Sequence, residues 1–251
     1  MKKDKIRWGM LGAGVIANAF VNDFKWMKNA ELIAVAASDA DRAKTFATKY
    51  NIPQALSYGE LYNSKDIDAV YISTTHNFHY EQTLKCLQHG KAVLCEKPIT
   101  VNDKECKKLA AFSQTNKVFL MEAMWTCFLP AIKKAREWVD EGRIGKLKVI
   151  QADFSYPMEK NMEGRMYNSK LAGGALLDLG VYPVFFATYF MNRKPGTITA
   201  SGVLTPTNVD AHTAMIFQYG DVTATLFTSM ETRMTNKGRL FGENGYIELQ
   251  N

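Results

Sequence analysis

The sequence predicts an α/β fold, in which a doubly wound parallel sheet is followed by a second domain of α+β type with an open, mainly antiparallel sheet. Short apolar runs alternate with helical stretches through the first half of the 251 residues. These runs are continuously apolar, as is typical of strands buried on both faces. In the second half, strand candidates follow one another, joined by short polar turns, with few helices between them.

The first half contains five strand candidates rich in branched residues, at residues 6–11, 32–37, 69–74, 92–95 and 118–121. Helical candidates lie between them at residues 15–27, 41–50, 79–89 and 103–115. A helix between each pair of strands supplies the crossover that parallel pairing requires. The pattern therefore predicts a doubly wound sheet.

The pattern changes after a helical candidate at residues 131–141. Strand candidates follow at residues 148–156, 197–204, 212–219 and 223–230, with one further helix at residues 177–191. Successive strands with short polar turns are typical of an antiparallel sheet. We therefore place a domain boundary near residue 125, which divides the chain into residues 1–124 and 125–251.

A glycine-rich loop ends the first strand candidate and opens a helix. It reads GxGxxA, with Gly12 for a tight turn, Gly14 for close approach of the backbone to a pyrophosphate, and Ala17 for helix–strand contact. Val15 and Ile16 begin a helix whose positive end would face the phosphates. Because strand, loop, helix and second strand occur in this order, we interpret the loop as a dinucleotide site of the Rossmann type rather than a merely structural turn.

The end of the second strand bears on the choice between NAD and NADP. Ala37 stands where an acid would hold the ribose of NAD, with Ser38 beside it as a donor and Arg42 as a possible phosphate partner. These residues favour NADP, although Asp39 could still serve NAD. The alternative is that Ser38 and Asp39 cap the following helix.

Polar residues also follow the later strands, at the sheet edge where open parallel sheets bind ligands. After the fourth strand we expect contacts to the nicotinamide ribose from Thr74, Thr75, His76 and His79. His79 fits a helix-packing role equally well.

The fifth strand runs into Glu96-Lys97-Pro98. The Lys97 ammonium could bind a substrate oxygen or lower the pKa of a neighbouring acid, and we expect Glu96 and Lys97 to lie close to the cofactor. Taken alone, Lys97 also fits a solvated surface lysine.

Three segments together resemble the Gfo/Idh/MocA oxidoreductase family: the glycine loop, the Glu-Lys-Pro sequence, and residues 173–182, which read GGALLDLGVY. The resemblance extends from residue 5 to residue 249. Residues 92–98 and 119–126 are similar to the branch that contains dimeric dihydrodiol dehydrogenases, xylose dehydrogenase and glucose-fructose oxidoreductase.

This resemblance implies a Rossmann domain at residues 1–124 and a substrate-binding and dimerisation domain at residues 125–251. It implies a catalytic lysine at Lys97 and an Asp-x-Gly-x-Tyr pair at Asp178 and Tyr182. The implied activity is hydride transfer between NADP(H) or NAD(H) and a carbinol of a sugar, a polyol or a trans-dihydrodiol. The implied assembly is a homodimer or a larger homo-oligomer formed through the C-terminal sheet.

The chemistry requires a base for the substrate hydroxyl, and a free tyrosine with a pKa of about 10 is too weak a base at neutral pH. We expect the Lys97 ammonium to favour the tyrosinate of Tyr182, and Asp178 to orient substrate or lysine. Their spacing would put Asp178 and Tyr182 on one helix face, although Pro183 disfavours helix at the residue before it. Packing for Tyr182 and capping for Asp178 are the alternative roles.

Three further residues are candidates for the substrate pocket. Trp125 could wall the pocket or seal the domain junction, and the resemblance favours the pocket. Arg165 and Tyr167 precede the glycine pair and could reach substrate hydroxyls, although such positions more often hold plain surface residues.

Composition narrows the function classes. The net charge of +6 is spread along the chain, so we expect no nucleic-acid partner. No apolar run approaches the roughly 18 residues that span a bilayer, so we expect no membrane partner. The histidines lack metal-ligand spacing, and we expect no metal. Four cysteines without a CxxC pair predict reduced thiols and a cytoplasmic protein.

Two expectations concern the C-terminus and the competing function class. Chains of the family continue beyond the last residues of this one and complete the second sheet, so we expect an open sheet edge that appears truncated. A non-catalytic dinucleotide-binding regulator of the same fold is the competing function, and Lys97, Asp178 and Tyr182 argue against it.

Overall fold

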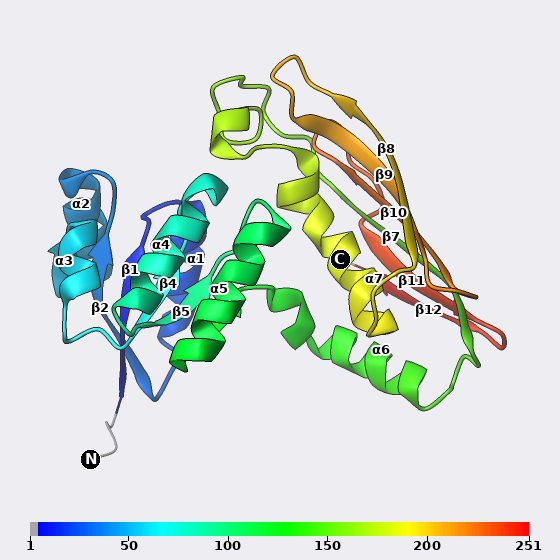
Figure 1. The fold of residues 1–251 in the computed structure, drawn as a ribbon, viewed down its shortest axis with the longest axis horizontal. Helices are drawn as coiled ribbons and strands as arrows, with labels where there is room; N and C mark the ends of the chain where they lie inside the picture. Colours follow the sequence, from blue (N-terminus) through cyan, green and yellow to red (C-terminus); the bar gives the residue numbers. More distant parts are fainter. Residues whose placement is uncertain (1–4, 251) are drawn as a thin grey trace. The chain divides into compact units, whose positions relative to one another are not determined.

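The computed structural model describes residues 5–250. The chain divides into two compact units, one ending at Ala123 and the other beginning at Met124. Each unit contains one six-stranded sheet, and most of the helices and strands are labelled in Figure 1.

The first unit is a doubly wound parallel sheet, as the sequence predicts. Its strand order is β3-β2-β1-β4-β5-β6, and every neighbouring pair is parallel. The strands are β1 Ile6–Leu11, β2 Ala30–Ala36, β3 Gln54–Leu56, β4 Ala69–Ile72, β5 Ala92–Cys95 and β6 Leu120–Glu122. The helices are α1 Val15–Phe24, α2 Ala40–Tyr50, α3 Tyr58–Asn63, α4 His76–Gln88 and α5 Asp103–Asn116.

Both faces of this sheet are buried, which explains the continuously apolar strands. Successive residues of one strand enter different cores: on β4, Tyr71 packs with the cluster that includes residues of α1 and α2, whereas Ile72 packs with the cluster that includes residues of α3, α4 and α5. The strand order reverses between β1 and β4, so the carboxyl ends of these two strands form the switch point where such sheets bind ligands.

Two short elements of the first unit were not predicted. Strand β3 has three residues, too few for a periodic signal. Helix α3 has six residues and begins with a capping box, in which Ser57 and Glu60 bond each other's backbone N–H. Local hydrogen bonds rather than apolar periodicity define α3.

The second unit carries a mixed sheet with the order β12-β11-β7-β10-β9-β8, in which β7 and β10 are parallel and the other neighbours antiparallel. Its strands are β7 Leu147–Ser155, β8 Thr197–Leu204, β9 Asp210–Gln218, β10 Thr223–Ser229, β11 Lys237–Gly242 and β12 Tyr246–Gln250. Its helical segments are η1 Trp125–Phe128, α6 Pro130–Asp140, η2 Ser169–Leu171, η3 Leu176–Gly180 and α7 Val181–Met191. The sequence did not predict β11 and β12.

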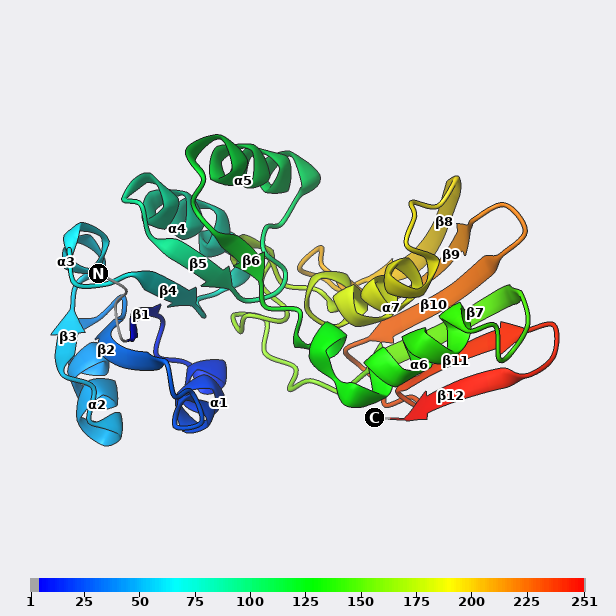
Figure 2. The same cartoon turned by 90° about the horizontal axis from the view of Figure 1, so that it is seen from below.

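Helices α6 and α7 lie on one face of the second sheet, as the views in Figures 1 and 2 agree. Phe186 and Phe190 of α7 pack there with Ile150 and Leu226 of the sheet. Residues Ser169–Met191 are long and apolar enough to cross a membrane by composition, contrary to our expectation that no such run exists. Burial of Phe186 and Phe190 against the sheet accounts for part of that apolar length.

Candidate active site

The glycine loop lies at the carboxyl end of β1. Gly12 has a φ of +101°, and a Cβ there would lie 2.9 Å from the backbone of Ser73, which follows β4. The Ser73 amide and hydroxyl bond the Leu11 carbonyl at 2.8 and 3.0 Å, so the loop is held close to the end of β4. Glycine is therefore required at position 12 both by conformation and by space.

The conformation and surroundings of Gly14 do not themselves require a glycine at this position. Its φ of −93° suits any residue, and a Cβ built on it would meet none of the described residues within 4 Å. Gly14 precedes α1, whose first turn contains no acidic residue and whose Val15 side chain is 92% exposed. Open space beside an uncompensated helix N-terminus fits the pyrophosphate of a dinucleotide.

Ala17 is fully buried in the cluster that contains Tyr71 of β4. A larger side chain would separate α1 from the sheet, so the small third position of the motif has its expected packing role.

The end of β2 presents the residues expected to distinguish NAD from NADP. Asp39 caps α2, because its Oδ1 accepts the Arg42 amide at 2.9 Å. The side chains of Ser38, Asp39 and Arg42 are exposed, whereas Ala37 is buried. The capping role that we considered for Asp39 is therefore present, and the Arg42 guanidinium lies on an exposed first turn.

The residues after β4 do not all face outward. The Thr74 hydroxyl donates to Gln82 Oε1 and the Thr75 hydroxyl to Asn77 Oδ1, both at 2.7 Å. His76 is 7% exposed, and its ring meets that of His79 edge to face.

The expected direct contact between His79 and the cofactor is wrong. His79 has no exposed surface, and its Nδ1 and Nε2 lie 2.7 and 3.0 Å from the carbonyl oxygens of Pro98 and Thr74. Its position in α4 turns the ring inward, in keeping with the packing role that we had considered for it.

The Glu96-Lys97-Pro98 segment follows β5 and is tied to the sheet. The Tyr71 hydroxyl donates a 2.5 Å bond to Glu96 Oε1, and the Ile99 amide donates to Glu122 Oε1 at 2.8 Å. Burial, and then the Glu96 carboxylate, raise the pKa of Tyr71, which keeps this phenol protonated as a donor. The sequence did not single out Tyr71, because an apolar strand residue gives no sign of its hydroxyl partner.

In the second unit, the glycine pair brings three segments together. A Cβ at Gly173 would lie 2.5 Å from the Met166 carbonyl oxygen, and one at Gly174 would lie 2.3 Å from Asp210 Oδ1. Asp210 also accepts the Leu176 amide at 2.8 Å. The glycines therefore let the start of η3 pack against the preceding loop and β9.

Asp178 and Tyr182 lie on different helical segments rather than on one α-helix. Residues Leu176–Gly180 form a π-helical turn, and α7 begins at Val181. Pro183 cannot donate to the carbonyl of residue 179 and would crowd it in a regular α-helix, and a widened turn relieves that conflict. The expected spacing along one helical face is corrected accordingly.

Asp178 is 5% exposed and is paired with Arg165. The two guanidinium nitrogens Nη1 and Nη2 donate to its two carboxylate oxygens, each at 3.1 Å. This bidentate geometry gives the Asp178 carboxylate a fixed orientation. Arg165, which was a candidate to bind substrate hydroxyls, is thus bound to Asp178, itself a candidate catalytic residue.

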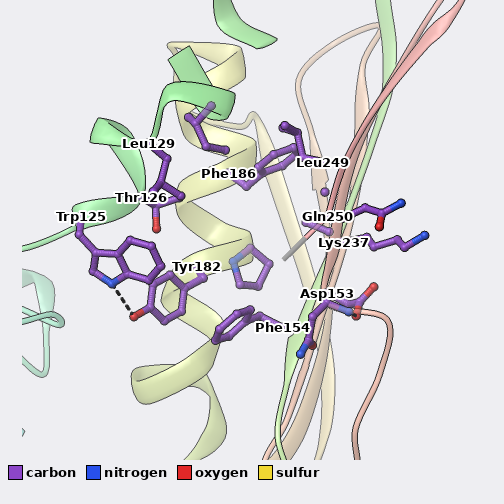
Figure 3. Close-up of a pocket in the computed structure, with 15 residues that line it drawn as sticks. Trp125, Thr126, Leu129, Asp153, Phe154, Tyr182, Phe186, Lys237, Leu249 and Gln250 are labelled. Atoms are coloured by element: carbon purple, nitrogen blue, oxygen red, sulfur yellow. Dashed lines mark hydrogen bonds between the residues drawn. The ribbon is translucent and has the colours of Figure 1, made fainter. Parts of the chain in front are cut away.

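Tyr182 stands beside a cavity of about 110 Å³ within the second unit. The Trp125 Nε1 donates to the Tyr182 hydroxyl at 3.1 Å, and Figure 3 shows both rings at the cavity with Phe154 and Phe186. The lining also contains four polar residues from the sheet and the loop before β11: Asp153, Asn236, Lys237 and Gln250. Trp125 therefore lines a cavity beside Tyr182, and its role as a substrate-pocket residue stays a prediction.

Comparison with known proteins shows the family to which the chain belongs. Residues 6–124 match the family described as "Oxidoreductase family, NAD-binding Rossmann fold", and residues 132–248 match the "GFO/IDH/MocA C-terminal domain". The chain belongs to the Gfo/Idh/MocA oxidoreductase family. The family resemblance in the sequence is thus confirmed, and the oxidoreductase interpretation is supported over that of a non-catalytic regulator.

Among curated relatives, this Gfo/Idh/MocA chain is 39% identical to trans-1,2-dihydrobenzene-1,2-diol dehydrogenase of Mus musculus over 98% of its length and 74% of the relative's. The Xenopus tropicalis protein of that name is 38% identical, with 97% and 74% covered. These relatives support an NAD(P)-dependent dehydrogenase acting on CH–OH groups.

Solved structures of family members superpose on most of the chain. An aldose-aldose oxidoreductase from Caulobacter crescentus has a TM-score of 0.91 at 23% identity, with 98% of this chain and 77% of that one covered. A 3-ketoreductase from Actinomadura kijaniata, solved with NADP and TDP-benzene, has a TM-score of 0.89 at 28% identity with the same coverage.

Tyr167, a candidate for contact with substrate hydroxyls and otherwise for the surface, is buried in this family member. The residue is 2% exposed and packs with Met166, Leu179 and Met230, and burial raises the pKa of its phenol. A core position removes its ring from direct contact with substrate. Phe154 was not predicted, and it lines the cavity 4.6 Å from the Tyr182 ring, centroid to centroid.

Proposed function

We propose that the protein transfers hydride between NADP and the carbinol of a trans-dihydrodiol, with sugars and polyols as the alternative substrates. The sequence match to named dihydrodiol dehydrogenases over almost the whole chain carries this proposal. A bound nicotinamide dinucleotide would supply the hydride acceptor, and the residues of this chain would bind it and manage the substrate proton.

The cofactor proposal rests on the glycine loop and the end of β2. Gly12, Gly14 and the first turn of α1 would hold the pyrophosphate. NADP is favoured over NAD because Ala37 offers no carboxylate, while Ser38 and Arg42 are exposed beside it.

The proton chemistry that we propose uses Tyr182 and Lys97, the residues that the family resemblance implies. The Tyr182 hydroxyl, as tyrosinate, takes the proton of the substrate hydroxyl, and the positive charge of Lys97 stabilises the tyrosinate. The Trp125 indole donates to the same oxygen at 3.1 Å, which also favours the deprotonated form. In this proposal the Asp178 carboxylate, oriented by Arg165, orients the substrate by accepting a hydrogen bond from one of its hydroxyl groups.

The substrate class follows from the cavity beside Tyr182. The lining includes the aromatic rings of Trp125, Phe154 and Phe186, and such rings bind the apolar face of a cyclic substrate. The polar residues of the lining, which include Asp153 and Lys237, offer hydrogen-bond partners to hydroxyl groups. A cyclic diol has both an apolar face and adjacent hydroxyls.

The first test uses catalytic variants with matched controls. Lys97→Met and Tyr182→Phe should each lower kcat with a trans-dihydrodiol by about 10²-fold or more, the usual effect of losing acid–base catalysis. Lys104→Met, on the exposed start of α5, and Tyr189→Phe, also on α7, should retain normal turnover. Near-normal rates in folded Lys97→Met and Tyr182→Phe would refute the mechanism.

The second test is a substrate screen. Dihydrodiols, aldoses and inositols are assayed with NADP and with NAD through nicotinamide absorbance. Turnover of the diols with NADP is expected. Cofactor binding without turnover of any carbinol would instead support the regulator function.

We also propose a homodimer formed through the second sheet. Every residue of β8 is exposed, including Ile198 at 60% and Leu204 at 64%, and an uncovered apolar edge strand is suited to pairing between copies. Light scattering should give the dimer mass, and Ile198→Asp should give the monomer mass. A wild-type monomer at micromolar concentration would contradict this assembly.

A cytoplasmic location completes the proposal. The four cysteines are free, two of them buried, as expected in a reducing compartment. Recovery of the native protein in an extracellular or periplasmic fraction would overturn this location.

A further inference from the structure

His79 is the fully buried histidine of the first unit. It occupies the first half of α4, and none of its surface is exposed. Its Nδ1 lies 2.7 Å from the Pro98 carbonyl oxygen and its Nε2 3.0 Å from the Thr74 carbonyl oxygen. Both ring nitrogens therefore face backbone acceptors.

These two carbonyl groups belong to two different strand ends. Thr74 follows β4, whereas Pro98 lies three residues after the end of β5 and directly after Lys97. A single rigid ring thus spans the two loops that leave the carboxyl edge of the sheet side by side, since β4 and β5 are hydrogen-bonded neighbours.

Lys97 is bracketed by residues with fixed partners. On one side, the Glu96 amide donates to the Ile72 carbonyl at 2.9 Å, and the Glu96 carboxylate accepts from Tyr71. On the other side, the Pro98 carbonyl faces His79. Since proline has no N–H, this carbonyl is the hydrogen-bonding group through which the backbone of Pro98 can be held.

We propose that His79 is a positioning residue that fixes the backbone on the C-terminal side of Lys97 by donating a hydrogen bond to the Pro98 carbonyl. This inference rests on the proposed role of Lys97. A displacement of about 1 Å away from the reacting atoms can cost about 10²-fold in rate, so this bond bears directly on turnover.

The protonation state of the His79 ring determines how many of its two nitrogens can donate a hydrogen bond. Burial lowers the pKa of His79, and the neighbouring His76 and Lys97 lower it further, while the two carbonyl contacts oppose this shift. A neutral imidazole carries one N–H, and in our proposal this proton is on Nδ1, which faces the nearer of the two carbonyl oxygens, that of Pro98. The contact with Thr74 becomes a second bond when the ring is doubly protonated.

This assignment distinguishes two conservative substitutions. The amide nitrogen of asparagine can occupy the place of Nδ1, whereas that of glutamine reaches the place of Nε2. His79→Asn should therefore keep the bond to Pro98, His79→Gln should lose it, and His79→Leu should lose both contacts. His89→Gln is the matched control, because this exposed histidine lies at the other end of α4 and contacts the Lys85 carbonyl at 2.8 Å.

The first measurement is hydrogen exchange by mass spectrometry in the full chain. The amides of Glu96, Lys97 and Ile99 should exchange faster in His79→Leu and His79→Gln than in the wild type, and at the wild-type rate in His79→Asn and His89→Gln. Unchanged exchange in His79→Leu and His79→Gln, with folding verified by circular dichroism, would overturn the inference.

The second measurement is turnover of a carbinol substrate. His79→Leu should lower kcat by about 10- to 100-fold with a smaller effect on KM, and His79→Asn should restore much of it. Faster exchange with an unchanged kcat would also overturn the positioning role. If the wild type turned over no carbinol, the proposed function would fail, while the exchange pattern would still decide whether His79 holds the Lys97 segment.

Discussion

The indole Nε1 of Trp125 donates a 3.1 Å hydrogen bond to the hydroxyl oxygen of Tyr182, and the two rings meet at 64° with their centroids 5.9 Å apart. Trp125 begins η1 and Tyr182 lies in the first turn of α7, so the bond joins segments distant in sequence. Because tryptophan can only donate, the phenol oxygen accepts, and the bond is stronger when that oxygen carries a negative charge.

Replacing this donor should change the pH dependence of oxidation. In Trp125→Phe, the tyrosinate loses a stabilising bond, so the midpoint at which kcat/KM rises with pH should move to higher pH. Initial rates measured across pH with a dihydrodiol check this. Trp138→Phe is the control, since its indole nitrogen is buried without a partner among the described residues. Identical midpoints in Trp125→Phe and wild type would contradict the role of this bond.

The Arg165–Asp178 pair should matter for stability. Arg165→Met leaves a carboxylate that is 5% exposed without its bidentate partner, which we expect to cost about 1–3 kcal/mol in the free energy of unfolding. Adding Asp178→Asn should recover part of this loss, because the buried charge is removed. Urea unfolding measures both, with Arg143→Met, from an exposed pair with Glu141, as a control expected to cost under about 1 kcal/mol. Equal losses in the two arginine variants would argue against a special role for the pair.

Alanine substitutions at the two glycines of the loop should have different effects on stability and on dinucleotide binding. Gly12→Ala combines a φ of +101° with a 2.9 Å clash against Ser73, so it should lower stability by about 1–3 kcal/mol and abolish dinucleotide binding. Gly14→Ala has an ordinary φ and open space, so it should fold normally and lose affinity for the dinucleotide alone. Thermal unfolding and nicotinamide fluorescence titration separate the two effects. Tight dinucleotide binding by Gly14→Ala would refute the assignment of this space to the pyrophosphate.

The first unit was predictable because its signals are local and repeated. Strand β1 and helix α5 were predicted almost to the residue, since burial on both sheet faces produces continuous apolar runs and an N-cap such as Asn102 marks where a helix begins. The mixed pairing of β7 with β10 was not predictable in this way, because alternation along a strand does not record the direction of its neighbour. Strands β11 and β12 were missed for a related reason: both combine charged and apolar residues in short runs.

The site residues also divide into those that local sequence motifs predict and those that depend on contacts between distant segments. Lys97, Asp178 and Tyr182 were singled out through motifs, which record residue type and spacing. The partners of the site, Tyr71 with Glu96 and Arg165 with Asp178, depend on contacts between distant segments, and no local pattern predicts them. Tyr167 and His79 were candidates for contact with substrate and cofactor, with a surface role and a packing role as their alternatives, and both are buried, because motif proximity does not show which way a side chain turns.

Cofactor choice should depend on Arg42. Its exposed guanidinium lies in the first turn of α2, one turn beyond Ser38, and NADP differs from NAD by the phosphate that such a group would bind. Arg42→Ala should weaken NADP binding by about tenfold, the loss of about 1.4 kcal/mol, and leave NAD binding unchanged. Fluorescence titration with both cofactors checks this, and Lys44→Ala on the same helix controls for general charge. Equal weakening of NADP binding and NAD binding would show that Arg42 does not bind the phosphate that distinguishes NADP.

The stability of the protein should fall in mild acid partly because of His79. Burial lowers the pKa of this ring in the folded state below its ordinary value of about 6.5, so the unfolded chain binds a proton that the folded chain resists. The contribution of the neutral His79 ring to the free energy of unfolding is complete above about pH 6.5. It is lost as the pH falls toward the pKa of this ring in the folded state. His79→Asn has no titrating ring there, so its free energy of unfolding should decline less between pH 7.5 and pH 5.5 than that of the wild type. Urea unfolding at the two pH values makes the comparison, in which the titrating groups common to both proteins cancel. Parallel declines would mean that His79 is as easily protonated in the folded chain as in the unfolded one.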